Sequence, residues 1–191
     1  YKIMSTIKVI DNFLDDETFK TFATLCMSYP HFGCADFATH DKDADGSIER
    51  FGEDLDTNVS PEVMFQAIML KREAGLVQIT DFYLASRFFI DKLQEKLNAL
   101  KFYVLRLNCT VRQPRAYTGI MHTDSHLRNE KFKNAILYLN TNNGGTRFED
   151  GTFVQSKKNR CVIAPVEMKH AGVWHTDAKL RFVLNINYIE N

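Results

Sequence analysis

Histidines and an acid gather at residues 121–126 (MHTDSH). His122 and Asp124 stand two positions apart, so on an extended chain both side chains project to the same face. An imidazole and a carboxylate placed in this way are suitable ligands for a divalent transition metal. An HxD pattern often arises by chance, so the pair predicts only a half-site that needs a further ligand from elsewhere in the chain.

A second histidine and an arginine follow near the C-terminus. His170 precedes Ala171 and Gly172, and Arg181 opens an alternating segment at residues 180–189. Alternation there gives two faces, one with Arg181, Val183, Asn185 and Asn187, the other with Phe182, Leu184, Ile186 and Tyr188. A buried arginine is costly unless it is paired, and its planar fork matches a carboxylate. Arg181 therefore predicts an anionic partner, with an exposed arginine on an edge strand as the alternative.

The order histidine, carboxylate, later histidine and arginine resembles the Fe(II)- and 2-oxoglutarate-dependent dioxygenases, specifically their prolyl-4-hydroxylase-like branch. Five segments match in order: HTD at 122–124, AILYLN at 135–140, GGTRF at 144–148, NRCVIAP at 159–165, and HAG at 170–172 followed by Arg181. The opening IKVIDNFL at 7–14 also resembles the start of many members. The ordered combination covers most of the chain and is more specific than any single motif.

This resemblance implies an α+β fold, a double-stranded β-helix (jelly roll) with N-terminal helices packed on its outside. We expect a single domain over residues 1–191, with a helical support region at about 1–100 and a catalytic jelly-roll core at about 101–191. His122, Asp124 and His170 would bind Fe(II) as a facial triad that leaves coordination positions open. Arg181 would bind the distal carboxylate of the cosubstrate 2-oxoglutarate, assisted by the hydroxyl of Tyr138.

The activity implied is hydroxylation of an unactivated C–H bond with O2, releasing succinate and CO2, with ascorbate as a candidate reductant. Asp124 favours hydroxylation, because related halogenases carry a small residue at that position. The expected substrate is a prolyl or other side chain of a peptide or protein. Two alternatives stay open: the same chemistry on a free amino acid, nucleobase or other small molecule, and a jelly-roll binding protein without turnover.

Several elements must position these residues. Residues 7–10 predict a strand, and acids at 15–17 followed by Phe19, Phe22, Cys26 and Tyr29 predict an amphipathic helix. Ser60 and Pro61 predict the start of a second helix that runs to about Glu73. A third helix is expected at 81–99, with Phe82, Phe89, Leu93, Leu97 and Leu100 on one stripe. Strands are expected at 101–111, 134–140, 160–164 and 180–189, and a long loop at 31–59.

Other residues compete for roles in the site. His175 lies only six residues before Arg181, so we favour His170 as the ligand, and we expect His126 in a turn near the mouth. Residues 41–48 (DKDADGSI) match the start of an EF-hand loop, but Gly52 stands where the bidentate glutamate belongs, which favours a solvated acidic turn. Trp174 and Tyr117 are candidates for the pocket wall. Several arginines could steer an acidic substrate: Arg106, Arg112, Arg115, Arg128 and Arg147.

The composition excludes several other classes of protein. The 191 residues carry 24 basic and 24 acidic side chains, which argues against a globally basic nucleic-acid binder. The two signs of charge are unevenly distributed along the chain. Residues 30–60 hold eight acids against two bases, and residues 101–133 hold seven bases against two acids. No apolar run is long enough to span a membrane. The four cysteines are scattered and no signal peptide opens the chain, so we expect a reducing, cytoplasmic setting.

Overall fold

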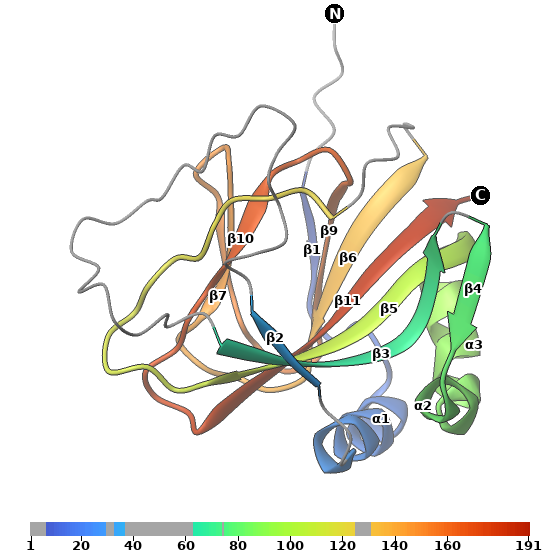
Figure 1. Ribbon diagram of the computed structural model, residues 1–191, viewed down its shortest axis with the longest axis horizontal. Coiled ribbons are helices and arrows are strands. Elements are labelled where there is room, and N and C mark those ends of the chain that lie inside the picture. Colours follow the sequence, from blue (N-terminus) through green and yellow to red (C-terminus); the bar gives the residue numbers. More distant parts are fainter. Residues whose placement is uncertain (1–6, 30–32, 37–62, 74, 125–130) are drawn as a thin grey trace, which may run out of the picture.

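Two antiparallel sheets dominate the computed structural model, which describes residues 7–29, 33–36, 63–73, 75–124 and 131–191 (Figure 1). The larger sheet runs in the order β1 (Lys8–Ile10), β9 (Arg160–Pro165), β6 (Phe132–Tyr138), β11 (Leu180–Glu190), β5 (Ala99–Val111), β3 (Val63–Glu73) and β2 (Gly33–Asp36), with β4 (Leu76–Ile79) paired to β3. The smaller sheet contains β10 (His170–Val173), β7 (Gly145–Phe148) and β8 (Phe153–Gln155). Phe148 and Val154 of the smaller sheet share a buried cluster with Ile136 and Val183 of the larger one, so the two sheets face each other.

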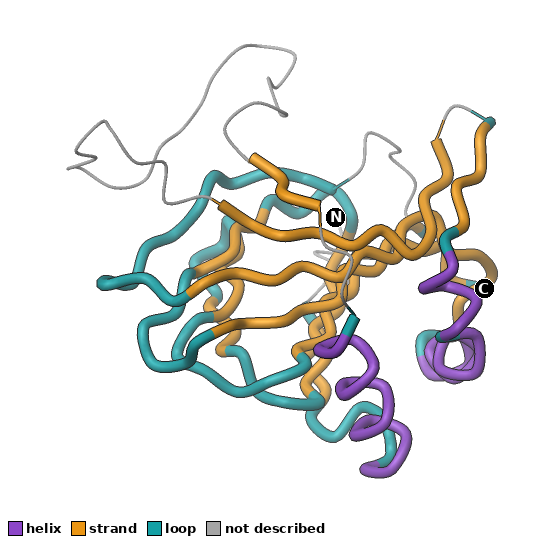
Figure 2. Tube along the Cα trace, turned by 60° about the horizontal axis from the view of Figure 1, so that its bottom comes forward, coloured by secondary structure: helices purple, strands orange, loops and turns teal. Residues whose placement is uncertain are grey.

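Three helices lie against the outer face of the large sheet (Figure 2). The first, α1 (Asp16–Ser28), begins at Asp15, whose carboxylate accepts a hydrogen bond from the backbone of Thr18 at 2.9 Å. It buries Phe19, Phe22 and Cys26 of the predicted stripe together with Ala23, whereas Tyr29 is its half-buried C-cap. The helices α2 (Asp81–Ala85) and α3 (Arg87–Lys96) follow the β4 strand. The predicted jelly roll with N-terminal helices on its outside is therefore confirmed.

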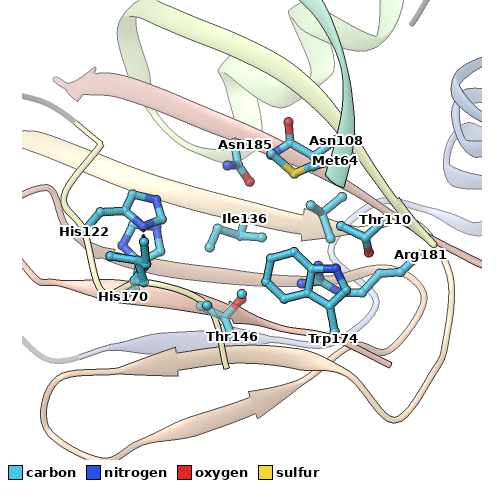
Figure 3. A pocket seen from close by; sticks show the side chains of 14 residues that line it. Met64, Asn108, Thr110, His122, Ile136, Thr146, His170, Trp174, Arg181 and Asn185 are labelled. Carbon is cyan, nitrogen blue, oxygen red and sulfur yellow. Dashed lines mark hydrogen bonds between the residues drawn. The ribbon is translucent and has the colours of Figure 1, made fainter. Parts of the chain in front are cut away.

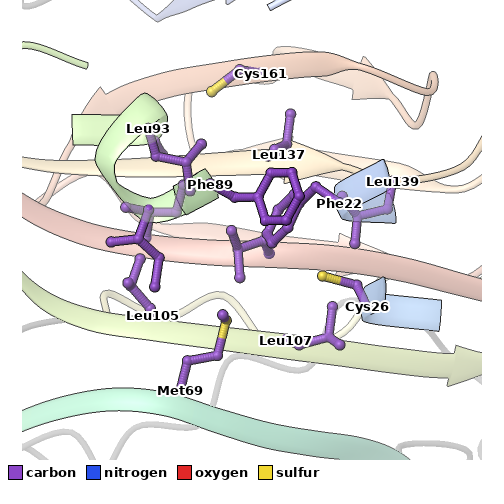
Figure 4. Packing of buried hydrophobic residues seen from close by; sticks show 14 of the residues in the cluster. Phe22, Cys26, Met69, Phe89, Leu93, Leu105, Leu107, Leu137, Leu139 and Cys161 are labelled. Carbon is purple, nitrogen blue, oxygen red and sulfur yellow. The ribbon is translucent and has the colours of Figure 1, made fainter. Parts of the chain in front are cut away.

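The alternation predicted for residues 180–189 is also confirmed in β11, and β6 alternates in the same way. Phe182, Leu184 and Ile186 point outward into the core beneath the helices, where Figure 4 shows Phe22 and Phe89 packed over Leu137. Val183 of β11 and Tyr138 of β6 point the other way, into the space between the two sheets. The inward faces of these strands thus belong to the site.

The helix predicted from Pro61 to Glu73 is wrong, because Val63–Glu73 is the strand β3. Its composition suits a helix, but pairing with β5 on one side and with β2 and β4 on the other overrides that preference. Met64 reaches the pocket, whereas Ala67 and Met69 join the helix-side core. A register irregularity between Ile68 and Leu70 breaks the strict alternation that would have revealed the strand.

The single helix predicted at 81–99 is likewise wrong. Ser86, with ψ of 7°, separates α2 from α3, and Leu97 caps the second helix. Leu100 lies in β5 and is 60% exposed, so it does not belong to the buried stripe. Residues 1–100 contribute β1 to β4 to the large sheet as well as the three helices.

Part of the predicted loop at 31–59 forms the strand β2, which pairs with β3. The remainder, with the EF-hand-like segment at 41–53, lies outside the described residues. Among the helices that the structure describes, none has the length and apolar character needed to cross a membrane.

Candidate metal centre and pocket

His122, Asp124 and His170 meet at one place although 46 positions of sequence separate Asp124 from His170. Their potential ligand atoms all lie within 4.8 Å of one another. His122 Nε2 is 3.6 Å from Asp124 Oδ1, and His170 Nε2 is 3.5 Å from Asp124 Oδ2. His170 begins β10, and Figure 3 shows its imidazole turned toward that of His122.

The hydrogen bonds of the two imidazoles leave the right nitrogen atoms for a metal. His122 Nδ1 lies 2.9 Å from the carbonyl oxygen of Ile120, and His170 Nδ1 lies 3.3 Å from that of Met168. A carbonyl only accepts, so each Nδ1 carries a proton, and each Nε2 becomes available to a metal when it is deprotonated. His170 Nε2 also lies 3.3 Å from Asn134 Nδ2. Both Nε2 atoms lie next to Asp124, so the donor set fits a divalent transition metal bound by two histidines and one carboxylate.

Asp124 is ionised inside the protein. Its side chain is 4% exposed, and burial opposes ionisation, but the neighbouring imidazoles of His170 and His122 hold its pKa well below the ordinary 3.8. Burial would lower the pKa of His122, yet the carboxylate of Asp124 raises it above 6.5. Within the described part of the chain, Asp124 Oδ2 has no hydrogen-bond partner, and its nearest charged neighbour is His170 Nε2 at 3.5 Å. The site therefore holds a buried negative charge with a lone pair available for a cation.

A pocket that is partly open to solvent connects this centre with Arg181 (Figure 3). Its wall combines side chains from the inner faces of β3, β5, β6 and β11 with others from the small sheet and from the segment after β5. The residues are Met64, Asn108, Thr110, Gly119, Ile120, His122, Ile136, Thr146, His170, Gly172, Trp174, Arg181, Val183 and Asn185.

Arg181 forms the far end of the pocket. The residue is 5% exposed, its Nη2 donates to the carbonyl oxygen of Gly145 at 2.9 Å, and its Nε has no hydrogen-bond partner. No acid forms an ion pair with it among the residues that the structure describes. Burial lowers its pKa from 12.5, but an arginine stays charged. A buried guanidinium with an unused N–H calls for an anion in the pocket.

Tyr138 lies behind this end of the pocket and does not line it. The residue is fully buried, and its hydroxyl donates to Thr146 Oγ1 at 2.7 Å, with the carbonyl oxygen of Val154 at 3.2 Å. Burial raises its pKa to about 12. Its ring centroid lies 5.7 Å from the guanidinium carbon of Arg181. Thr146 therefore stands between the phenol and the pocket, and Tyr138 orients both Thr146 and Arg181.

The other predicted residues divide into three groups. Trp174 is 5% exposed, lines the pocket, and packs against Tyr117 with ring centroids 4.9 Å apart. His175 is buried but lies outside the group of three metal-ligating side chains. His126 and Arg128 fall outside the described residues.

Sequence reasoning missed a polar row on the inner face of β5. Asn108 and Thr110 line the pocket, and both Asn108 Oδ1 and Thr110 Oγ1 are buried without hydrogen-bond partners. Arg106 begins the same row, since the three residues occupy alternate positions of one strand. The signal was available: polar side chains at 106, 108 and 110 alternate with Leu105, Leu107 and Cys109.

No family model matches this sequence, and no curated protein matches it. The fold is similar to that of an oxidoreductase of the 2OG-Fe(II) oxygenase family from Burkholderia pseudomallei, with a TM-score of 0.64, 10% identity, and coverage of 100% of this chain and 87% of that one. It is also similar to a non-haem alpha-ketoglutarate-dependent epimerase, SnoN, from nogalamycin biosynthesis (TM-score 0.59, 13% identity, coverage 97% and 79%).

A third similar structure is a prolyl hydroxylase from Trichoplax adhaerens in complex with a peptide fragment of the hypoxia inducible factor oxygen degradation domain. The TM-score is 0.57 at 13% identity, covering 96% of this chain and 83% of that one. At such identities the likeness shows the fold alone. The predicted resemblance to 2-oxoglutarate oxygenases, prolyl hydroxylases among them, is confirmed at that level.

Proposed function

We propose that this protein is an Fe(II)- and 2-oxoglutarate-dependent dioxygenase that hydroxylates an unactivated C–H bond. One observation carries the proposal: a single pocket has a histidine–aspartate–histidine cluster at one end and, at the other, a buried arginine that has no acidic partner among the described residues. A metal and a dicarboxylate would satisfy both ends. A binding module without turnover needs no such combination.

The chain's own residues divide the work. His122 and His170 would offer their Nε2 atoms and Asp124 a carboxylate oxygen to Fe(II), while Arg181 would hold the distal carboxylate of 2-oxoglutarate with Thr146 and Tyr138 behind it. Bound Fe(II) with 2-oxoglutarate supplies O2-dependent oxidation of a C–H bond, with release of succinate and CO2. One wall of the pocket is apolar and consists of Met64, Ile136, Val183 and Trp174.

We further propose a prolyl or other side chain of a peptide or protein as the substrate. Support comes from the sequence resemblance and from the likeness to a prolyl hydroxylase that was solved with a peptide. The second candidate, a small molecule, is favoured by the likeness to an epimerase of nogalamycin biosynthesis. Ascorbate as reductant and a cytoplasmic location belong to this proposal and rest on the sequence alone.

Anaerobic addition of Fe(II) and 2-oxoglutarate tests the activity. We expect a weak visible metal-to-ligand absorption band, followed by succinate formation when air is admitted. Both signals should be lost in His170→Ala. Absence of both signals from the wild-type protein would refute the proposal.

The substrate is tested by screening peptides and metabolites for stimulated succinate formation together with the mass of the product. A hydroxylase adds the mass of one oxygen atom, whereas an epimerase forms succinate with no gain of oxygen. Stimulation by metabolites but by no peptide would contradict the peptide assignment.

A further inference from the structure

Arg106 lies beside the metal-ligating cluster in the centre of the large sheet. Its strand, β5, pairs with β11 on one side and with β3 on the other, which places Arg106 between Asn185 and Ile68. Pairing on both sides fixes the backbone at this position. Its neighbours Leu105 and Leu107 point into the helix-side core, so the Arg106 side chain points to the inner face, toward the pocket.

The Arg106 side chain reaches one oxygen of the candidate metal ligand Asp124. Nη2 of Arg106 lies 3.6 Å from Asp124 Oδ1, and the two side chains are 25% and 4% exposed. Nε of Arg106 is buried without a hydrogen-bond partner. Among the ion pairs of the described residues, Asp124 is the only acid that Arg106 meets. The guanidinium thus lies beside this carboxylate.

The two oxygens of Asp124 are therefore not equivalent. Among the ion pairs of the described residues, Oδ1 lies 3.6 Å from both Arg106 Nη2 and His122 Nε2, while Oδ2 lies 3.5 Å from His170 Nε2 and has no arginine beside it. A group that contacts the atom of a ligand side chain that does not bind the metal fixes the orientation of that side chain. Removal of such a group typically weakens metal binding. A carboxylate with one oxygen held by an arginine offers the other to the cation. This leaves coordination positions open for a cosubstrate.

We propose that Arg106 is a positioning residue that holds Asp124 Oδ1 and thereby sets the metal affinity and the open coordination of the site. This inference rests on the proposed function, since it assumes that Asp124 binds the metal. It assigns Arg106 a role different from that of Arg181. Arg106 orients a protein ligand, whereas Arg181 would bind the cosubstrate at the other end of the pocket.

Anaerobic titration with Co(II), followed through its visible absorption, tests the inference without turnover. Arg106→Gln should weaken Co(II) binding about tenfold or more, and Arg106→Lys should recover a large part of that loss. The Co(II) band should also change in shape in Arg106→Gln, because a carboxylate released from Arg106 can bind through both oxygens. The affinity of the Co(II)-loaded variant for 2-oxoglutarate should then fall.

Arg147→Gln is the matched control for the loss of one positive charge. Arg147 lies on β7 and pairs with Ala171, the residue that follows His170 in the chain. The guanidinium carbon of Arg147 lies 5.5 Å from the ring centroid of Phe153, and the side chain forms no ion pair with Asp124 among the described residues. This variant should bind Co(II) with the wild-type affinity and spectrum. If Arg106→Gln does not fold, Arg106→Met keeps the stem, loses the charge, and carries the same prediction.

The outcomes separate the two proposals. Wild-type protein that binds no Co(II) would refute the proposed function, and this inference with it. Wild-type binding together with unchanged affinity and spectrum in the neutral variants of Arg106 would overturn the role of Arg106 alone. Equal weakening in Arg147→Gln would also overturn it, since the effect would then be one of net charge.

Discussion

His122 and His170 exchange two backbone hydrogen bonds, from each N–H to the other's carbonyl oxygen, at 3.0 and 2.9 Å. Their imidazole centroids lie 4.9 Å apart. The two residues are therefore an antiparallel bridge pair, whose side chains lie on the same face. The convergence of the two imidazoles follows from backbone pairing and does not depend on a bound metal. This preorganisation lets the site bind a cation without first ordering its ligands.

His170→Ala should abolish Co(II) binding, whereas His175→Ala should retain it. The reason is that the imidazole of His170 has its Nε2 3.5 Å from Asp124, while His175 is not part of the cluster. Visible absorption on anaerobic titration measures the difference, and thermal unfolding of the metal-free proteins controls for folding. Retained binding in His170→Ala with loss in His175→Ala would reverse the ligand assignment.

Arg181→Lys should raise the KM for 2-oxoglutarate about tenfold or more while leaving Co(II) affinity unchanged. A lysine keeps the positive charge but cannot replace the planar fork, and its ammonium would also lose the geometry of the Nη2 bond to Gly145. Initial rates at varied 2-oxoglutarate, together with a Co(II) titration, separate cosubstrate binding from metal binding. Loss of Co(II) affinity in this variant would mean that Arg181 supports the metal centre instead.

The sequence predicted most of the site through its resemblance to the 2-oxoglutarate-dependent dioxygenases, which implied the metal ligands and the role of Arg181. Short-range alternation predicted the face of β11 on which Arg181 and Asn185 lie. What it could not predict is which strands are neighbours. Arg106 lies beside Asp124 only because β5 is central in the sheet, and that order depends on long-range pairing.

The wrong prediction of a helix at 61–73 also arises because the pairing of distant strands cannot be read from the sequence. Met64, Ala67 and Leu70 follow helical spacing, and nothing local excludes a helix. Tertiary pairing of β3 with β5 decides the outcome, with the register irregularity after Ile68 moving Leu70 to the core side. The strand carries Met64 into the pocket wall, so this error also hid a residue of the site.

Gly119→Ala should weaken binding of the substrate that is hydroxylated more than binding of 2-oxoglutarate. A Cβ at Gly119 would lie 2.8 Å from Cζ3 of Trp174, so the indole that lines the pocket must move. Gly172→Ala is the control, because its Cβ would meet the same Trp174 atom at an ordinary 3.7 Å. KM values for both substrates measure the effect. Equal behaviour of the two variants would show that Trp174 does not shape the pocket at this wall.

The stability of the metal-free protein should fall on acidification partly because of His175. Burial, and next the charge of Arg181, lower the pKa of this fully buried histidine below 6.5. The unfolded chain therefore binds a proton at a higher pH than the folded protein does. By linkage, stability is lost as the pH falls from the unfolded value of 6.5 toward the lower folded value.

His175→Leu isolates this contribution, because the leucine cannot titrate and the raised pKa of His122 is present in both proteins. Urea unfolding from pH 8 to pH 5 should give a free energy of unfolding that falls less steeply in the variant than in the wild type. The difference between the two curves should be constant above the ordinary histidine pKa and change below it. Parallel curves over the whole range would show that His175 is not the acid-sensitive group.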